Sequence, residues 1–173
     1  MKYGKTGRAR NCLIVCPKSV LTDWERKLWE WAPELNRVLK IAGPQSQRRM
    51  QWNTDAYVYI VTYDTLRHDL SDSDYSQSRI QQRGFDLIIL DEIQRIKNPG
   101  AKLTKAVHMV SAPIRWGLSG TPLENRIEDV LSIFAYIKPG SSGFSVLRIP
   151  SITSRTFVLD DLVNAVHELE PAA

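Results

Sequence analysis

Two adjacent carboxylates, Asp91 and Glu92, directly follow the apolar run at residues 87–90. A short run of branched apolar residues is typical of a strand buried in a parallel sheet, where ligands bind beyond the carboxyl ends of the strands. One carboxylate at such a position can hold Mg²⁺, and its neighbour can orient or deprotonate an attacking water. The same pair is also common as an acidic helix start, so the pair alone leaves a helix cap and a metal site as alternatives.

A second polar segment, residues 117–125, ends another apolar run and opens a helical pattern. The hydroxyls of Ser119 and Thr121, on either side of Gly120, could hydrogen bond the acidic motif on a neighbouring strand. The local alternative is a hydroxyl helix cap followed by a proline in the first turn. A hydrolase nucleophile elbow is excluded, because it requires glycine two places after the serine, where Thr121 stands.

The elements that must position these groups follow an alternating pattern. Strand-like runs are expected at residues 12–16, 37–41, 57–61, 87–90 and 115–118. Helical patterns are expected at residues 24–31, with Thr22 or Asp23 as the cap, and at 45–52, 103–110 and 127–137. The polar stretch at 71–74 is predicted as a surface loop. This alternation predicts an α/β fold of three layers, a parallel sheet with helices on both faces.

Composition limits the class of protein. The chain has 173 residues, 43% of them hydrophobic and 24% charged, which suits one folded domain with a proper core. Its net charge of +4 is compatible with a nucleic-acid partner. Cys12 and Cys16 are predicted as buried thiols, because no second Cys/His pair is available for zinc. Without a signal peptide or a membrane-length apolar run, we expect an intracellular location, in the cytoplasm, nucleoid or nucleus, and no membrane partner.

Four segments in order carry a family resemblance: LIVCPKSVLTDWERKLWEWAP, YIVTYDTLR, FDLIILDEIQRIKN and RWGLSGTPLENRIEDVLSIFAYIKPG. Together they resemble the Swi/Snf-like ATPases, double-stranded-DNA translocases of helicase superfamily two. The match covers residues 12–140. The resemblance implies that residues 1–140 form an incomplete first lobe of two, RecA-like and of the P-loop NTPase type. Residues 141–173 are expected to form a linker and a C-terminal helix of uncertain role.

The resemblance also implies ATP and Mg²⁺ as cofactors. Asp91 would ligate Mg²⁺, and Glu92 would position the hydrolytic water. Gln94, where many relatives carry His, would link the acidic motif to the Ser119-Gly120-Thr121 turn, which would couple the ATP state to the grip on DNA.

Double-stranded DNA is the partner that the resemblance implies, with protein partners as a further expectation. The expected contacts are to phosphates and sugars, which hold a duplex without reading its sequence. The residues at matching positions are Pro17, Lys18, Ser19, Thr62, Tyr63, Lys97 and Asn98. For the two lysines a solvated surface side chain is the alternative. Three tryptophans, Trp24, Trp29 and Trp31, are interpreted as helix-packing residues.

The tripeptide Gly4-Lys5-Thr6 is not interpreted as the family's phosphate-binding loop. No strand or glycine-rich lead precedes it, and residues 7–11 are too few for the helix that follows such a loop. We therefore expect Lys5 not to touch phosphate, and the phosphate loop and second lobe to lie outside this sequence. The isolated chain would then be a poor ATPase. Two alternatives stay open: a catalytically incompetent lobe that binds DNA or protein, and an RNA helicase, against which the GTPLEN turn argues.

Overall fold

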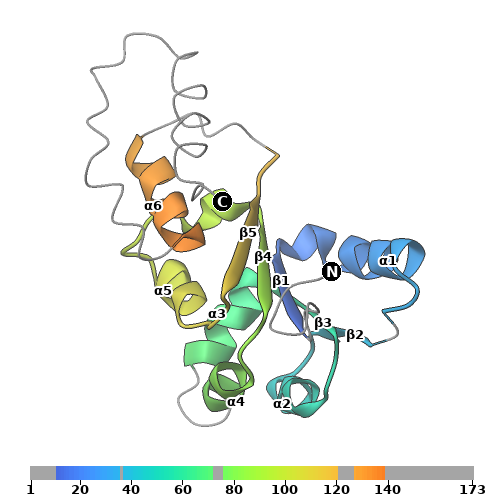
Figure 1. The fold of residues 1–173 in the computed structure, drawn as a ribbon. Helices are drawn as coiled ribbons and strands as arrows, with labels where there is room; N and C mark the ends of the chain where they lie inside the picture. Colours follow the sequence, from blue (N-terminus) through green and yellow to red (C-terminus); the bar gives the residue numbers. More distant parts are fainter. Residues whose placement is uncertain (1–10, 36, 72–75, 121–126, 139–173) are drawn as a thin grey trace, which may run out of the picture. The chain divides into compact units, whose positions relative to one another are not determined.

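The computed structural model describes residues 11–35, 37–71, 76–120 and 127–138. Within these ranges, five parallel strands form one sheet in the order β2-β3-β1-β4-β5 (Figure 1). The strands are β1 (Cys12–Cys16), β2 (Val38–Ile41), β3 (Val58–Thr62), β4 (Leu87–Asp91) and β5 (Ile114–Leu118). Each strand that the sequence predicts is confirmed to within one residue at either end. The chain divides into two units, Met1–Gly140 and Ser141–Ala173, and every described residue belongs to the first.

Helices cover both faces of this sheet. They are α1 (Leu21–Trp31), α2 (Gln45–Asn53), α3 (Tyr63–Ser71), α4 (Ser76–Arg83), α5 (Lys102–His108) and α6 (Ile127–Ile137). Two short 3₁₀ helices, η1 (Lys18–Val20) and η2 (Ile93–Ile96), follow β1 and β4. Figure 1 shows α1 on one side of the sheet and α3, α5 and α6 on the other.

The core divides accordingly into two clusters, because successive side chains of a strand point to opposite faces. On β1, Leu13 and Val15 join the larger cluster, which includes buried residues from α2 to α6. Cys12, Ile14 and Cys16 join the smaller cluster, against which α1 packs. The predicted three-layer α/β architecture is confirmed.

The two helices between β3 and β4, α3 and α4, were not predicted from the sequence. α3 includes Ser71, the first residue of the predicted loop at 71–74, and residues 72–74 lie outside the described ranges, as does the predicted C-terminal helix. The predicted cap of the helix after β1 is also wrong. α1 begins at Leu21 as a direct continuation of η1, so Thr22 and Asp23 lie inside its first turn, and Val20 precedes the helix without a side-chain cap.

Both cysteines are free and buried, as predicted. Burial raises the pKa of each thiol to about 12, and for Cys16 the charge of Asp91 adds to the effect. No helix in the described part of the chain has the length and apolar character that a membrane span requires.

Candidate functional site

The predicted site residues converge at the carboxyl end of the sheet. Cys16 at the end of β1 pairs with Thr62 at the end of β3, and Asp91 at the end of β4 pairs with Leu118 at the end of β5. β1 also pairs with β4, so these four strands are consecutive neighbours. The segments that follow them therefore emerge side by side, which is where parallel α/β sheets place their ligands.

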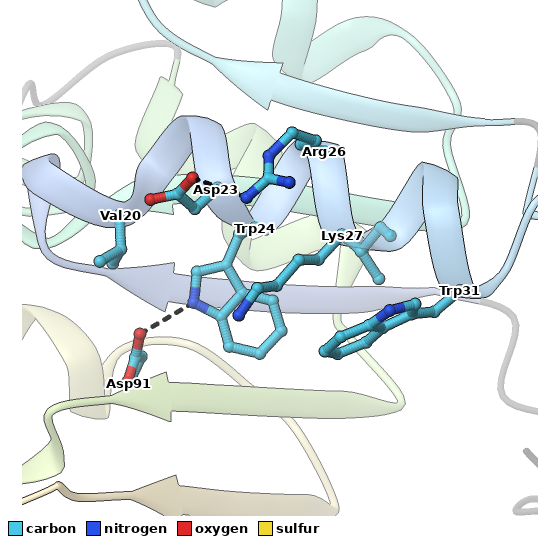
Figure 2. A pocket seen from close by; sticks show the side chains of 8 residues that line it. Val20, Asp23, Trp24, Arg26, Lys27, Trp31 and Asp91 are labelled. Carbon is cyan, nitrogen blue, oxygen red and sulfur yellow. Dashed lines mark hydrogen bonds and ion pairs between the residues drawn. The ribbon is translucent and has the colours of Figure 1, made fainter.

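Asp91 is half-buried and is held at two points. Its carboxylate oxygen Oδ2 accepts a hydrogen bond of 2.8 Å from the indole Nε1 of Trp24 (Figure 2). Its backbone carbonyl accepts one of 2.9 Å from the hydroxyl of Tyr63. Burial, and then the charge of Asp91, raise the pKa of Tyr63, so this hydroxyl keeps its proton and remains a donor.

The donor set at Asp91 fits a cation that arrives with a phosphate ligand. Among the described residues, the second carboxylate oxygen of Asp91 receives no hydrogen bond, and Glu92 is the next residue. The same part of the chain contains no group of three or more Asp, Glu, His or Cys residues that could enclose a metal. Mg²⁺ is commonly held by one or two carboxylates, several waters and substrate phosphates, so the single carboxylate of Asp91 without further protein ligands suits it.

Glu92 has a left-handed backbone, with φ 57° and ψ 54°. It is the only residue other than glycine with positive φ in the described ranges. Such conformations cost free energy and cluster at functional sites. Here the turn redirects the chain from β4 into η2, whose Ile93 and Ile96 are buried, and it leaves the Glu92 carboxylate half-exposed. The helix-cap alternative for the acidic pair is not what forms, because Glu92 makes no side-chain cap bond to η2.

Gln94 connects the acidic motif to the segment after β5. Its Nε2 donates to Oε2 of Glu92, and its Oε1 accepts a hydrogen bond of 2.9 Å from Oγ of Ser119. Gly120 is also close, because a Cβ atom at this position would lie 3.7 Å from Oε1 of Glu92. Thr121 lies outside the described residues. The side chains of Glu92, Gln94 and Ser119 are thus connected by two consecutive hydrogen bonds.

Gly117 allows this close approach of β5 to η2. A Cβ atom at Gly117 would lie 2.3 Å from Cδ1 and 3.2 Å from Cβ of Ile93, so any side chain there would collide with the buried residue that follows Glu92. The glycine therefore sets the distance between the two halves of the site.

The residues predicted to contact DNA differ in how far they reach the surface. Lys18 and Ser19 are the first two residues of η1 and are exposed, whereas Pro17, which precedes the helix, is half-buried. The side chains of Thr62 and Tyr63 point inward: Thr62 Oγ1 accepts from the amide of Thr65 at the start of α3, and Tyr63 is only 1% exposed.

Lys97 and Asn98, after η2, are both exposed. The side-chain oxygen of Asn98 accepts a hydrogen bond from the amide of Gly100, which closes a local turn. The pair is therefore at the surface, with the Asn98 side chain engaged in its own loop. Lys5 lies outside the described residues.

Sequence reasoning missed the role of Trp24. The predicted packing role is confirmed, because Trp24 packs on the smaller core cluster, but its indole N–H also donates a hydrogen bond to the Asp91 carboxylate. The same interpretation is wrong for Trp29 and Trp31, which are exposed on the outer part of α1. Trp31 and Lys27 form a cation–π contact at the margin of an open pocket between α1 and Asp91 (Figure 2).

A parallel α/β lobe with an acidic motif and a serine turn joined at the carboxyl end of its sheet is the RecA-like architecture of helicase-like motors. Within that class, the profile of the SNF2-related domain matches residues 1–146, and the chain belongs to this family. The architecture is also that of a solved structure, the Sulfolobus solfataricus SWI2/SNF2 ATPase core in complex with dsDNA. The TM-score is 0.68 and the identity 29%, over 92% of this chain and 32% of that one.

Curated relatives include proteins much longer than this chain. The TATA-binding protein-associated factor MOT1 of Saccharomyces cerevisiae is 33% identical over 146 residues, 82% of this chain and 7% of that protein. The helicase-like transcription factor of Mus musculus is 34% identical over 134 residues, 76% of this chain and 13% of that protein. The chain thus spans about a tenth of the length of these relatives.

Proposed function

We propose that residues 1–140 form part of the first RecA-like lobe of an ATP-dependent motor that moves along double-stranded DNA, with residues 141–173 as a linker and terminal helix. The observation that carries this proposal is the pair of consecutive hydrogen bonds that connects Glu92 through Gln94 to Ser119, beside Asp91. This link joins the acidic motif, in which Asp91 suits Mg²⁺ and Glu92 suits the attacking water, to the segment that follows the next strand. A change in one can therefore reach the other through two hydrogen bonds.

Each residue of the site then has a distinct task. Asp91 supplies the carboxylate that holds the Mg²⁺ of Mg-ATP, and the metal neutralises phosphate charge when bound. Glu92 orients the attacking water and accepts its proton. Gln94 fixes the Glu92 carboxylate by donating to it, and it passes the state of the acidic motif to Ser119, Gly120 and Thr121.

The DNA part of the proposal rests on the surface beside this site. Lys18, Ser19 and Lys97 are exposed near the carboxyl end of the sheet, and a related ATPase core has been solved with dsDNA. Lys18 and Lys97 would contact phosphates, and Thr62, Tyr63 and Asn98, whose side chains are engaged within the protein, would contribute through their backbone. The same proposal includes an intracellular location, in a compartment that contains DNA. It also includes binding to protein partners.

Duplex binding by the chain tests the DNA part. We expect the affinity for a fluorescent mixed-sequence duplex, measured by anisotropy, to fall linearly in a log–log plot against salt, because counterions are released. Lys18→Ala should reduce the slope by about 1, since a single phosphate contact is lost. Lys102→Ala, at an exposed lysine that begins α5 and is not among the proposed DNA contacts, is the matched control and should leave the slope unchanged. Salt-insensitive binding, or a preference for single-stranded RNA, would contradict the proposal.

Hydrolysis of ATP by the same chain, with and without the duplex, tests the catalytic part. Asp91→Asn removes the charge that holds the cation and changes little in shape, so it is the control. Turnover that the duplex stimulates and that this variant loses would support catalysis within the 173 residues. Duplex binding without turnover above the control would assign the chain a binding role, with catalysis dependent on further protein.

A further inference from the structure

Two aromatic side chains, one from each face of the sheet, donate hydrogen bonds to Asp91. Trp24 packs on the cluster between the sheet and α1, and it reaches the carboxylate. Tyr63 belongs to the larger cluster on the opposite face, and it reaches the backbone carbonyl of the same residue. The two bonds, of 2.8 Å and 2.9 Å, therefore fix the side chain and the main chain of Asp91 independently.

The two aromatic residues also occupy comparable places in the chain. Trp24 lies in the first turn of α1, which continues without a break from η1 and its exposed Lys18. Tyr63 begins α3 directly after Thr62, the last residue of β3. Trp24 is thus connected by a continuous helix to a segment proposed to contact DNA, and Tyr63 is itself part of the second such segment. A movement of either segment would change a bond to Asp91.

We propose that Trp24 and Tyr63 are positioning residues for Asp91. The indole N–H of Trp24 holds one carboxylate oxygen of Asp91, which leaves the other oxygen oriented to bind the cation. The Tyr63 hydroxyl holds the backbone carbonyl of Asp91 and so fixes the position of the main chain at the end of β4. The role of Asp91 as the cation ligand rests on the function proposed above. Groups that orient a metal ligand in this way commonly alter metal affinity about 10- to 100-fold when removed.

The indole bond can be tested in the free chain by ¹⁵N NMR of the five tryptophan side chains. Trp52 is a matched internal control, because its indole donates to a carboxylate, that of Asp69, at the same distance of 2.8 Å. Asp91→Asn should shift the Trp24 indole signal and speed its exchange with solvent about tenfold, since a hydrogen bond to a charged acceptor is replaced by a weaker one. The Trp52 signal should not change. Equal responses, or none at Trp24, would overturn the bond to Asp91.

Cation binding provides the second readout, with Mn²⁺ alone as a paramagnetic probe. We expect Mn²⁺ to broaden the signals around Asp91, and Trp24→Phe and Tyr63→Phe each to weaken this binding by about tenfold. Trp29→Phe, an exposed position on the same helix, should bind Mn²⁺ like the parent chain. Circular dichroism melts identify variants that fail to fold. Unchanged Mn²⁺ binding in folded Trp24→Phe and Tyr63→Phe variants would show that neither residue positions the carboxylate.

These measurements use neither ATP nor DNA, so they fail separately from the proposed function. If both readouts hold but the chain does not bind a duplex, the positioning role stands and the DNA part of the proposed function falls. If a duplex binds, it should shift the Trp24 indole signal more than that of Trp52. A bound duplex that leaves Trp24 unshifted would overturn the link from the η1 segment to Asp91.

Discussion

Glu92 combines a carboxylate proposed to act on water with a backbone conformation that side chains seldom adopt. A left-handed residue is tolerated best as glycine or asparagine and worst when the side chain branches at Cβ. The strain is thus kept at the residue whose carboxylate Gln94 holds. The turn places that carboxylate beside Gly120, which an ordinary extended continuation of β4 would not do.

Substitutions at Glu92 should therefore separate backbone strain from loss of the carboxylate. Both Glu92→Val and Glu92→Asn remove the acid, but valine cannot adopt φ 57° without a clash. We expect Glu92→Val to lower the free energy of unfolding by about 1–2 kcal/mol more than Glu92→Asn. Urea unfolding followed by circular dichroism measures the difference. Equal stability of the two variants would mean that the turn relaxes to an ordinary conformation at no cost.

At the scale of the elements, the contact of β5 with η2 depends on the absence of a side chain at Gly117. Gly117→Ala should lower stability by about 1–3 kcal/mol, because the new methyl group overlaps Ile93. Ile93→Val removes Cδ1, the nearest atom, so the double variant should recover part of that loss. A double-mutant cycle by chemical denaturation measures the coupling. Strictly additive effects would show that Ile93 does not limit the approach of the two elements.

The buried thiols of β1 predict how stability changes at alkaline pH. The pKa of Cys12 and Cys16 is about 12 in the folded chain and about 9 when the thiols are exposed, so the unfolded chain loses these protons first. Their contribution to stability is therefore complete below pH 9 and is lost as the pH rises from about 9 to 12. Denaturation curves between pH 7 and 11 should show this fall. A Cys12→Ala/Cys16→Ala variant should be less stable at pH 7 but should fall less steeply; an equal slope would contradict this assignment.

At the scale of the whole molecule, a buried carboxylate away from Asp91 connects two of the helices. Asp69 on α3 is 1% exposed and accepts hydrogen bonds from Arg48 and Trp52, both on α2. Asp69→Ala leaves the largely buried Arg48 guanidinium without its charged partner, so we expect the free energy of unfolding to fall by about 3–5 kcal/mol. Asp55→Ala, which breaks an ion pair with Arg83 at a side chain that is 84% exposed, should cost less than 1 kcal/mol. Comparable losses in thermal or urea unfolding would refute the distinction.

The sequence predicted the layers and the convergence of the site because both follow from short apolar runs. Where a buried strand ends, the polar residues that follow must emerge beside those of its neighbours, which placed Asp91, Glu92, Gln94 and Ser119 together. α4 carries no such signal, because Ile80 is its only apolar residue. α3 starts without a break after β3, so its first residues continue the strand pattern.

The bond from Trp24 to Asp91 could not be predicted in the same way. It depends on where α1 crosses the sheet, and that position results from packing between residues far apart in the sequence. An indole among apolar residues gives the same pattern whether or not its N–H finds a partner.

β5 has a practical consequence for the behaviour of the chain in solution. It is the last strand on one side of the sheet that the structure describes, and Trp116 and Leu118 are 41% and 40% exposed on the face that carries Ile89. An edge strand with exposed apolar side chains is a template for pairing with other chains. We expect light scattering to show self-association that grows with protein concentration, and Trp116→Lys to suppress it. A monomer at every concentration would contradict this expectation. Self-association would set an upper limit on the protein concentration that can be used for spectroscopy.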